Sequence, residues 1–147
     1  MSGIRENEME EFMAKIKHLA IITLDPDRLA KFYQEVFDMK ILHRPPNSKA
    51  VFVTDGYITM ALLPNTAEGK PTGLNHFGFE IEDQEEIAER LEKFGMATPA
   101  KRPADRPYAE TRATDPDGNN FDLSVHGFQN VELAAEREAK AKQKVDA

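Results

Sequence analysis

Three side chains in this sequence have the types and spacing of a metal site. His18 and His76 each stand inside an apolar stretch, KIKHLAIITL and LNHFGFEI, and Asp122 stands inside the alternating stretch NNFDLSVH. Short apolar or alternating stretches of this kind predict β-strands. Two histidines and one carboxylate that meet on one face form a facial triad, which holds a divalent metal, typically Fe(II), and leaves positions open for a substrate.

Strand alternation predicts that the three side chains face a common hollow. His76 shares a strand face with Gly78 and Glu80, while phenylalanines take the other face, which a helix must cover. Asp122 belongs to a polar row with Asn120, Ser124 and His126. His18 is the one imidazole in an otherwise apolar row with Ala20, Ile22 and Leu24.

An internal repeat supports this arrangement. His76 follows His18 by 58 residues (76 − 18), and the same shift places Asp25 on Asp83 and Leu29 on Ile87. Each half predicts a strand, a helix and three further strands. The first half has strands at 15–24, 40–43, 49–54 and 57–63, with a helix from 26 to about 38. The second half has strands at 74–81, 108–114 and 119–126, at most a short edge strand within 96–107, and a helix ending near 94.

The predicted fold is α+β, with two βαβββ modules that form a curved mixed sheet. The modules span 15–64 and 74–128, joined by a linker over 65–73. A polar extension precedes them at 1–14, and a charged helical tail follows at 129–147. Apolar stripes on the two helices are expected in the core: Leu29, Phe32, Tyr33, Val36 and Phe37 on the first, and Ile87, Leu91 and Phe94 on the second.

Composition excludes several classes of function. The net charge of −7 argues against nucleic acid or an anionic membrane as partner. No apolar run approaches the roughly 20 residues of a membrane span, and the acidic start lacks the apolar stretch of a secretory signal. The chain has no cysteine, which excludes disulfides and thiolate chemistry. We therefore expect a cytoplasmic protein.

The three motifs resemble those of the vicinal oxygen chelate superfamily, which includes glyoxalases, extradiol dioxygenases and bleomycin-resistance proteins. The resemblance covers Lys15 to His126 and includes the DPDG turn before Asp122. It implies a divalent metal on His18, His76 and Asp122, with Fe(II) favoured and Mn, Ni or Zn as alternatives. It also implies a homodimer acting on a small molecule.

Departures from the family pattern bear on the reaction. The fourth ligand expected for glyoxalase I falls on Met60 or Ala61, and Arg112 stands where extradiol dioxygenases have a tyrosine. Ala20 stands where fosfomycin transferases have a threonine. The last ligand of the family is usually Glu, and Asp122 is shorter by about 1.5 Å.

The sequence offers further site residues. Glu80, Tyr108 and His126 are candidates for catalytic proton transfer, and Arg112, Glu110 and Ser124 for substrate binding. The favoured function is an Fe(II) dioxygenase-like enzyme acting on a substrate with vicinal oxygens. A glyoxalase-type lyase or isomerase with a redox-inert metal is one alternative. A metal-free small-molecule binding protein, with both histidines as core residues and Asp122 as a structural acid, is the other.

Overall fold

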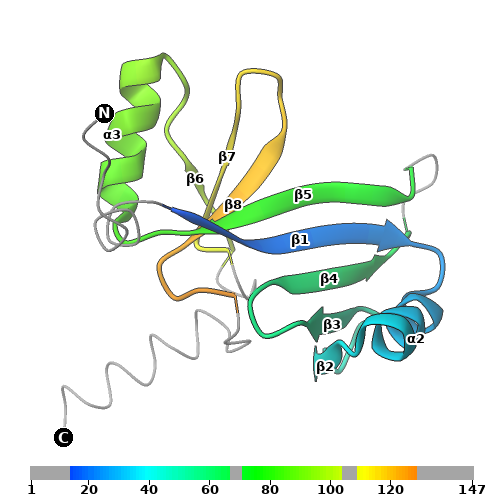
Figure 1. Cartoon of the computed structure of the whole chain (residues 1–147). Helices are drawn as coiled ribbons and strands as arrows, with labels where there is room; N and C mark the ends of the chain where they lie inside the picture. Colours follow the sequence, from blue (N-terminus) through cyan, green and yellow to red (C-terminus); the bar gives the residue numbers. More distant parts are fainter. Residues whose placement is uncertain (1–13, 67–70, 104–108, 129–147) are drawn as a thin grey trace, which may run out of the picture.

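Eight strands of the chain form one mixed, curved sheet in the order β2-β3-β4-β1-β5-β8-β7-β6 (Figure 1). The computed structural model describes residues 14–66, 71–103 and 109–128. The elements, in chain order, are β1 (Lys15–Thr23), α2 (Pro26–Phe37), β2 (Lys40–His43), β3 (Val51–Thr54), β4 (Thr59–Pro64), β5 (Gly73–Glu80), α3 (Gln84–Phe94), β6 (Ala100–Lys101), β7 (Thr111–Thr114) and β8 (Asn120–Ser124).

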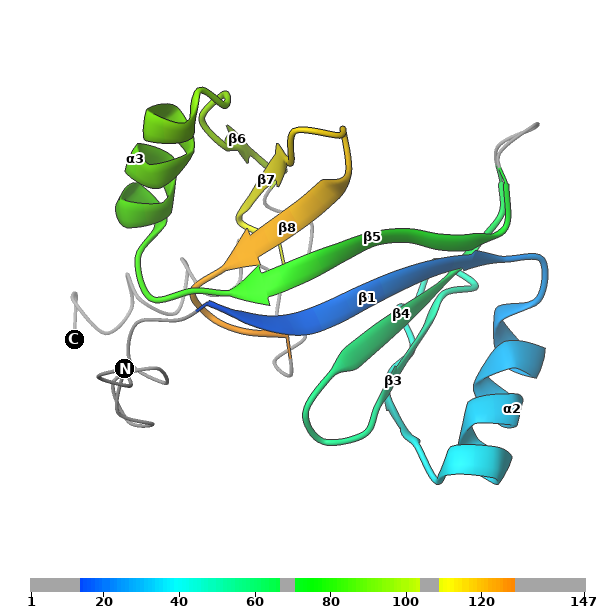
Figure 2. The ribbon, with the colours of Figure 1, turned by 45° about the horizontal axis from the view of Figure 1, so that its top comes forward.

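The two halves of the sheet repeat one strand order. The first half runs β2-β3-β4-β1 and the second runs β6-β7-β8-β5, each with one helix after its first strand. Strand β1 pairs parallel to β4 and antiparallel to β5, and β5 pairs parallel to β8. The pair β1–β5 therefore joins the halves along the middle of the sheet (Figure 2). The predicted α+β fold with two βαβββ modules is confirmed.

Local sequence explains where the helices begin and end. The backbone N–H of Arg28 donates to Asp25 Oδ1, and that of Glu85 donates to Asp83 Oδ1, so an aspartate caps each helix at its N-terminus. Gly95 ends α3 in the left-handed conformation, with φ of 94°.

Each helix covers an apolar face of its own half of the sheet. Helix α2 packs through Ala30, with Leu29 and Tyr33, against the cluster Val51, Val53, Met60 and Leu62. In the second half, Ile87 and Leu91 of α3 belong to the cluster that contains Phe77, Phe79 and Phe121. Both helices therefore lie on the sheet face opposite to the histidines.

The prediction that the full helical stripes are core is wrong. Phe32, Phe37 and Phe94 are 48%, 63% and 75% exposed, and Val36 is also exposed. A single helix on a sheet buries only the residues that point directly at the strands, which in α2 are those near Leu29, Ala30 and Tyr33. The rest of each stripe faces outward.

Several strands are shorter than the sequence predicts. Strand β4 begins at Thr59 because Tyr57 and Ile58 belong to a turn in which their backbone N–H groups donate to Asp55 Oδ1. Strand β8 ends at Ser124, two residues before the predicted end.

Most of the predicted N-terminal extension, part of the linker and the whole C-terminal tail lie outside the described residues. Within the described ranges, no helix has the length and apolar character needed to cross a membrane.

Candidate metal centre

Strand register brings His18, His76 and Asp122 together on the helix-free face of the sheet. His18 of β1 pairs with Gly78 of β5, and Gly78 pairs with Asp122 of β8, so these three positions form one row across three strands. His76 lies two residues before Gly78 and faces the same side. All three polar side chains are buried, with exposed fractions of 2%, 9% and 3%.

The distances within this triad suit one metal ion. Asp122 Oδ2 lies 3.1 Å from His76 Nε2 and 3.9 Å from His18 Nε2, and one donor atom from each residue lies within 4.8 Å of the others. Adjacent ligands on an octahedral ion with bonds of about 2.1 Å stand about 3 Å apart. The His76–Asp122 pair already has this spacing, and His18 would have to move by about 1 to 2 Å to complete a facial set.

The protonation states of His18 and Asp122 also suit a metal. Burial, followed by the charge of His76, lowers the pKa of His18 from 6.5 to about 4. Burial alone would raise the pKa of Asp122, but hydrogen bonds from His76 and Arg112 outweigh it and lower that pKa below its usual 3.8. At neutral pH the site thus holds a neutral His18 imidazole and an ionised carboxylate, the forms that bind a divalent cation.

Neighbouring side chains orient the triad. Arg112 of β7 donates from Nε to Asp122 Oδ1 over 2.6 Å, and its Nη2 lies 3.4 Å from His76 Nε2. His76 Nδ1 lies 2.8 Å from Asn75 Oδ1, and this contact turns Nε2 of the same ring toward Asp122 Oδ2, 3.1 Å away. Outer partners of this kind fix the direction of metal ligands. With Oδ1 held by Arg112, Oδ2 is the oxygen available to a metal.

The position of a fourth ligand on β4 is apolar. Thr59 and Ala61 pair with His18 and Ala20, so they share the face of the triad. Met60 points to the other face and packs with α2. Of the two residues predicted for this position, Ala61 is the one on the correct face, and its methyl group cannot bind a metal. Among the described residues, three donors form the metal-competent group.

Comparison with known proteins places the chain in a family. Residues 15–123 match the Glyoxalase/Bleomycin resistance protein/Dioxygenase superfamily. The chain belongs to this superfamily. A relative from Bacillus subtilis (strain 168), described as a probable trivalent organoarsenical cleaving enzyme, is 29% identical over 117 residues, which cover 74% of this chain and 78% of that protein.

Solved structures of other proteins share the fold. Methylmalonyl-CoA epimerase from Mycobacterium tuberculosis is 16% identical, with a TM-score of 0.59 over 74% of this chain and 85% of that chain. A 2,3-dioxygenase from Pseudomonas sp. KL28 is 17% identical, with a TM-score of 0.62 over 82% of this chain and 42% of that chain. These identities establish a common architecture, and they leave the reaction open.

Of the other residues predicted for the superfamily site, Arg112 alone contacts the triad in the described structure. Glu110 accepts from the backbone N–H groups of Val125 and His126, at 2.9 and 3.4 Å. Ser124 is fully buried and donates from Oγ to the carbonyl of Gly127 over 3.3 Å. Both side chains therefore hold the turn after β8.

The candidates for proton transfer also lie away from the triad. Glu80 packs against Gly127, where an added Cβ would come within 2.5 Å of Glu80 Oε1. The His126 side chain is 52% exposed, beyond the end of β8, with Nε2 4.0 Å from Glu110 Oε1. Tyr108 lies outside the described residues.

Two residues at the centre were not predicted. Gly78 lies between His18 and Asp122 in the row, and Phe128 stacks on His18, with ring centroids 5.0 Å apart and planes 5° apart. A glycine inside a strand often marks a close approach of another group, so Gly78 carried a usable signal. Phe128 carried none, because it lies outside every predicted strand.

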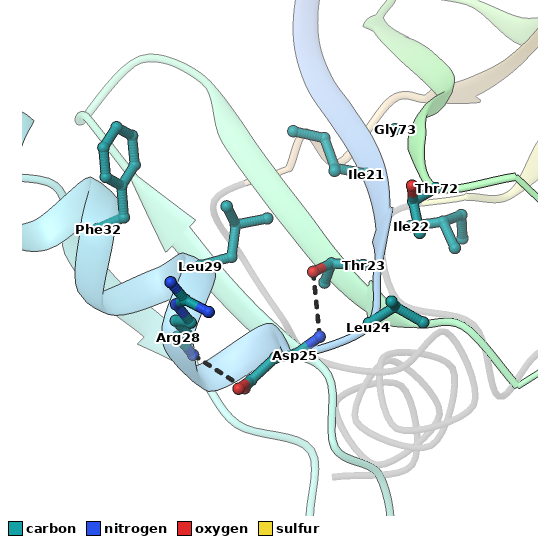
Figure 3. Close-up of a pocket in the computed structure, with 10 residues that line it drawn as sticks. All are labelled: Ile21, Ile22, Thr23, Leu24, Asp25, Arg28, Leu29, Phe32, Thr72 and Gly73. Carbon is teal, nitrogen blue, oxygen red and sulfur yellow. Dashed lines mark hydrogen bonds between the residues drawn. The ribbon is translucent and has the colours of Figure 1, made fainter.

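A separate hollow of about 590 Å³ lies beside α2, at the end of β1 (Figure 3). Its walls are mainly apolar, from Ile21, Leu24, Leu29 and Phe32. Asp25, its one carboxylate, caps α2. This hollow includes none of the triad residues.

Proposed function

We propose that the protein is a metal-dependent enzyme whose centre is His18, His76 and Asp122, with Fe(II) as the favoured metal and oxygenation as the favoured reaction. One observation carries the proposal. The buried two-histidine, one-carboxylate set has an alanine, Ala61, where a fourth protein ligand would stand. Fe(II) held there would supply a Lewis-acidic, redox-active centre with several coordination positions open.

Charge at the site favours an anionic substrate. With a metal bound, both histidines would be neutral ligands, and the charge of the ionised Asp122 would be balanced by the Arg112 guanidinium. The charge of a bound divalent ion would therefore be left uncompensated in this buried site. An anionic substrate would neutralise it. We therefore infer a small substrate with oxygens on neighbouring carbons, at least one of them ionised. Arg112 would bind the ionised oxygen with the N–H groups that Asp122 does not use.

The substrate class named for the Bacillus subtilis relative is not part of this proposal. Trivalent arsenic is a soft centre that prefers thiolate ligands, and this chain has no cysteine to provide one. Oxygen donors, by contrast, match both an open Fe(II) site and the guanidinium of Arg112.

Metal content and oxygen uptake test the proposal. Protein purified without added metal is analysed for bound metal. The Fe(II)-loaded protein is then placed in an oxygen electrode with 2-oxo acids, vicinal hydroxy-carbonyl compounds and catechols, with His76→Ala as the inactive control. We expect oxygen uptake with at least one anionic compound. Anaerobic turnover by the Zn(II), Ni(II) or Mn(II) protein, with no oxygen uptake by the iron form, would replace this reading with a lyase or isomerase. Tight ligand binding without any metal would indicate a binding protein.

A further inference from the structure

Phe128 is brought back across the sheet by the turn that follows β8. The segment leaves β8, passes β5 and β1, and reaches β4 (orange in Figures 1 and 2). There the Thr59 hydroxyl donates to the carbonyl of Phe128 over 2.6 Å. The Phe128 side chain is only 1% exposed. Its backbone is thus fixed to β4 while its ring enters the space above β1 and β5.

The ring of Phe128 fits a slot made by the absence of a side chain at Gly78. A Cβ built on Gly78 would lie 2.8 Å from Phe128 Cζ and 3.0 Å from His18 Cβ. These approaches are shorter than van der Waals contact. In this slot the phenyl ring lies parallel to the His18 imidazole, with centroids 5.0 Å apart.

We propose that Phe128 is a positioning residue that fixes the plane of the His18 ring, so that Nε2 is directed at Asp122 Oδ2. The value of this orientation for metal binding rests on the proposed function. An imidazole donates to a metal along a direction in its own plane, so rotation of the ring turns the donor lone pair away. The phenyl ring lies parallel to the imidazole and offset from it, with centroids 5.0 Å apart, and opposes that rotation by steric contact with part of one imidazole face.

The turn between β8 and Phe128 is built to hold this placement. Glu110 accepts from the N–H groups of Val125 and His126, and Ser124 donates to the carbonyl of Gly127. Gly127 has a φ of 79°, a conformation that favours glycine. The predicted site residues Glu110 and Ser124 thus act on the centre through Phe128 rather than by contact with the triad.

Replacement of Phe128 by Leu tests the role, with Phe52→Leu as the matched control. Phe52 is buried in the same apolar cluster as Phe128, and its ring lies against His43. The Kd for Co(II) is measured by chelator competition, and the visible spectrum of the Co(II) protein reports ligand geometry. We expect Phe128→Leu to weaken Co(II) binding by about 10-fold or more and to change the spectrum, because loss of an orienting partner costs about 10- to 100-fold in metal affinity. Phe52→Leu should change the Kd by less than about 2-fold at a comparable loss of thermal stability.

Proton NMR of the metal-free, full-length protein separates this inference from the metal proposal. The stacked phenyl ring should shift the carbon-bound ring protons of His18 upfield in the unsubstituted protein. Phe128→Leu should remove that shift. If Phe128→Leu does not fold, Gly78→Ala, which pushes the two rings apart, should alter the same signals. Failure of the unsubstituted protein to bind Co(II) would remove the metal proposal, and the NMR result would still decide the stacking. Unchanged His18 signals, or equal Kd losses for Phe128→Leu and Phe52→Leu, would overturn the positioning role.

Discussion

Arg112 and Asp122 meet over 2.6 Å through Nε and Oδ1, and this contact decides which carboxylate oxygen is free to face the two histidines. The Asp122 side chain is 4% exposed and that of Arg112 is 26% exposed. The arginine therefore reaches a buried carboxylate from the partly open side of the sheet.

Substitution of the arginine should weaken the centre without removing a ligand. In Arg112→Gln, the buried carboxylate loses its charged partner and its fixed orientation. We expect metal affinity to fall by about 10- to 100-fold and the metal-free protein to lose about 2 kcal/mol of stability. Arg112→Lys keeps the charge without the planar geometry and should give an intermediate loss. Chelator competition and urea unfolding measure both quantities. Unchanged affinity in Arg112→Gln would show that the pair does not orient the ligand.

Removal of His76 should abolish stoichiometric metal binding and leave the fold intact. The unsubstituted protein should melt at a higher temperature with excess metal, because a ligand that binds only the native state stabilises it, by about 2.7 kcal/mol at 100 times the Kd. His76→Ala should lose this shift. His43→Ala is the matched control, because His43 contacts Phe52 and lies outside the triad. Retained tight binding in His76→Ala would remove the central claim.

The metal-free protein should lose stability as the pH falls from about 6.5 to about 4. Burial lowers the pKa of His18 to about 4, so the unfolded chain takes up a proton at this residue before the folded chain does. Stability therefore rises with pH across this window and is lost below it. At about 1.4 kcal/mol per pKa unit, the contribution is on the order of 3 kcal/mol. Urea unfolding at pH 7 and pH 4.5 measures it, and His18→Gln should flatten the dependence. An equal slope in that variant would assign the effect to other groups.

The outward apolar residues support the proposal of a homodimer. On α2, Phe32, Val36 and Phe37 are 48%, 56% and 63% exposed, and the ring centroids of Phe32 and Phe37 lie 6.1 Å apart. Exposed apolar residues that adjoin one another in this way often mark protein interfaces. Light scattering at micromolar concentration should give twice the chain mass of 16.6 kDa. Phe37→Ser should shift the equilibrium towards the monomer. A metal-bound monomer of the unsubstituted protein would exclude a centre shared between chains.

The triad could be selected from the sequence because its signals are local and repeated. Alternation within each strand identifies the polar face, and the 58-residue repeat matches His18 with His76. Alternation does not give the distance along a strand. Glu80 shares the face of His76, but two further steps of about 6.7 Å carry it past the centre. It therefore packs against Gly127 instead.

The contacts that complete the centre depend on tertiary structure. Phe128 and His18 are 110 residues apart (128 − 18), and they meet because a turn returns the chain across two strands. His126 was expected on the last strand, but Ser124 Oγ accepts its backbone N–H in that turn, so the strand has already ended. Exposure of Phe32 and Phe94 depends on how much of each helix the sheet covers, which periodicity does not specify.

The triad spans the boundary between the two halves of the sheet, at the position of Gly78. His18 belongs to the first half, His76 and Asp122 to the second, and the backbone at Gly78 lies on the boundary between them. A metal ion held by all three side chains would therefore cross-link β1 and β5. Removal of the metal should first speed amide hydrogen exchange between β1 and β5. Amides that pair within each half of the sheet should stay protected.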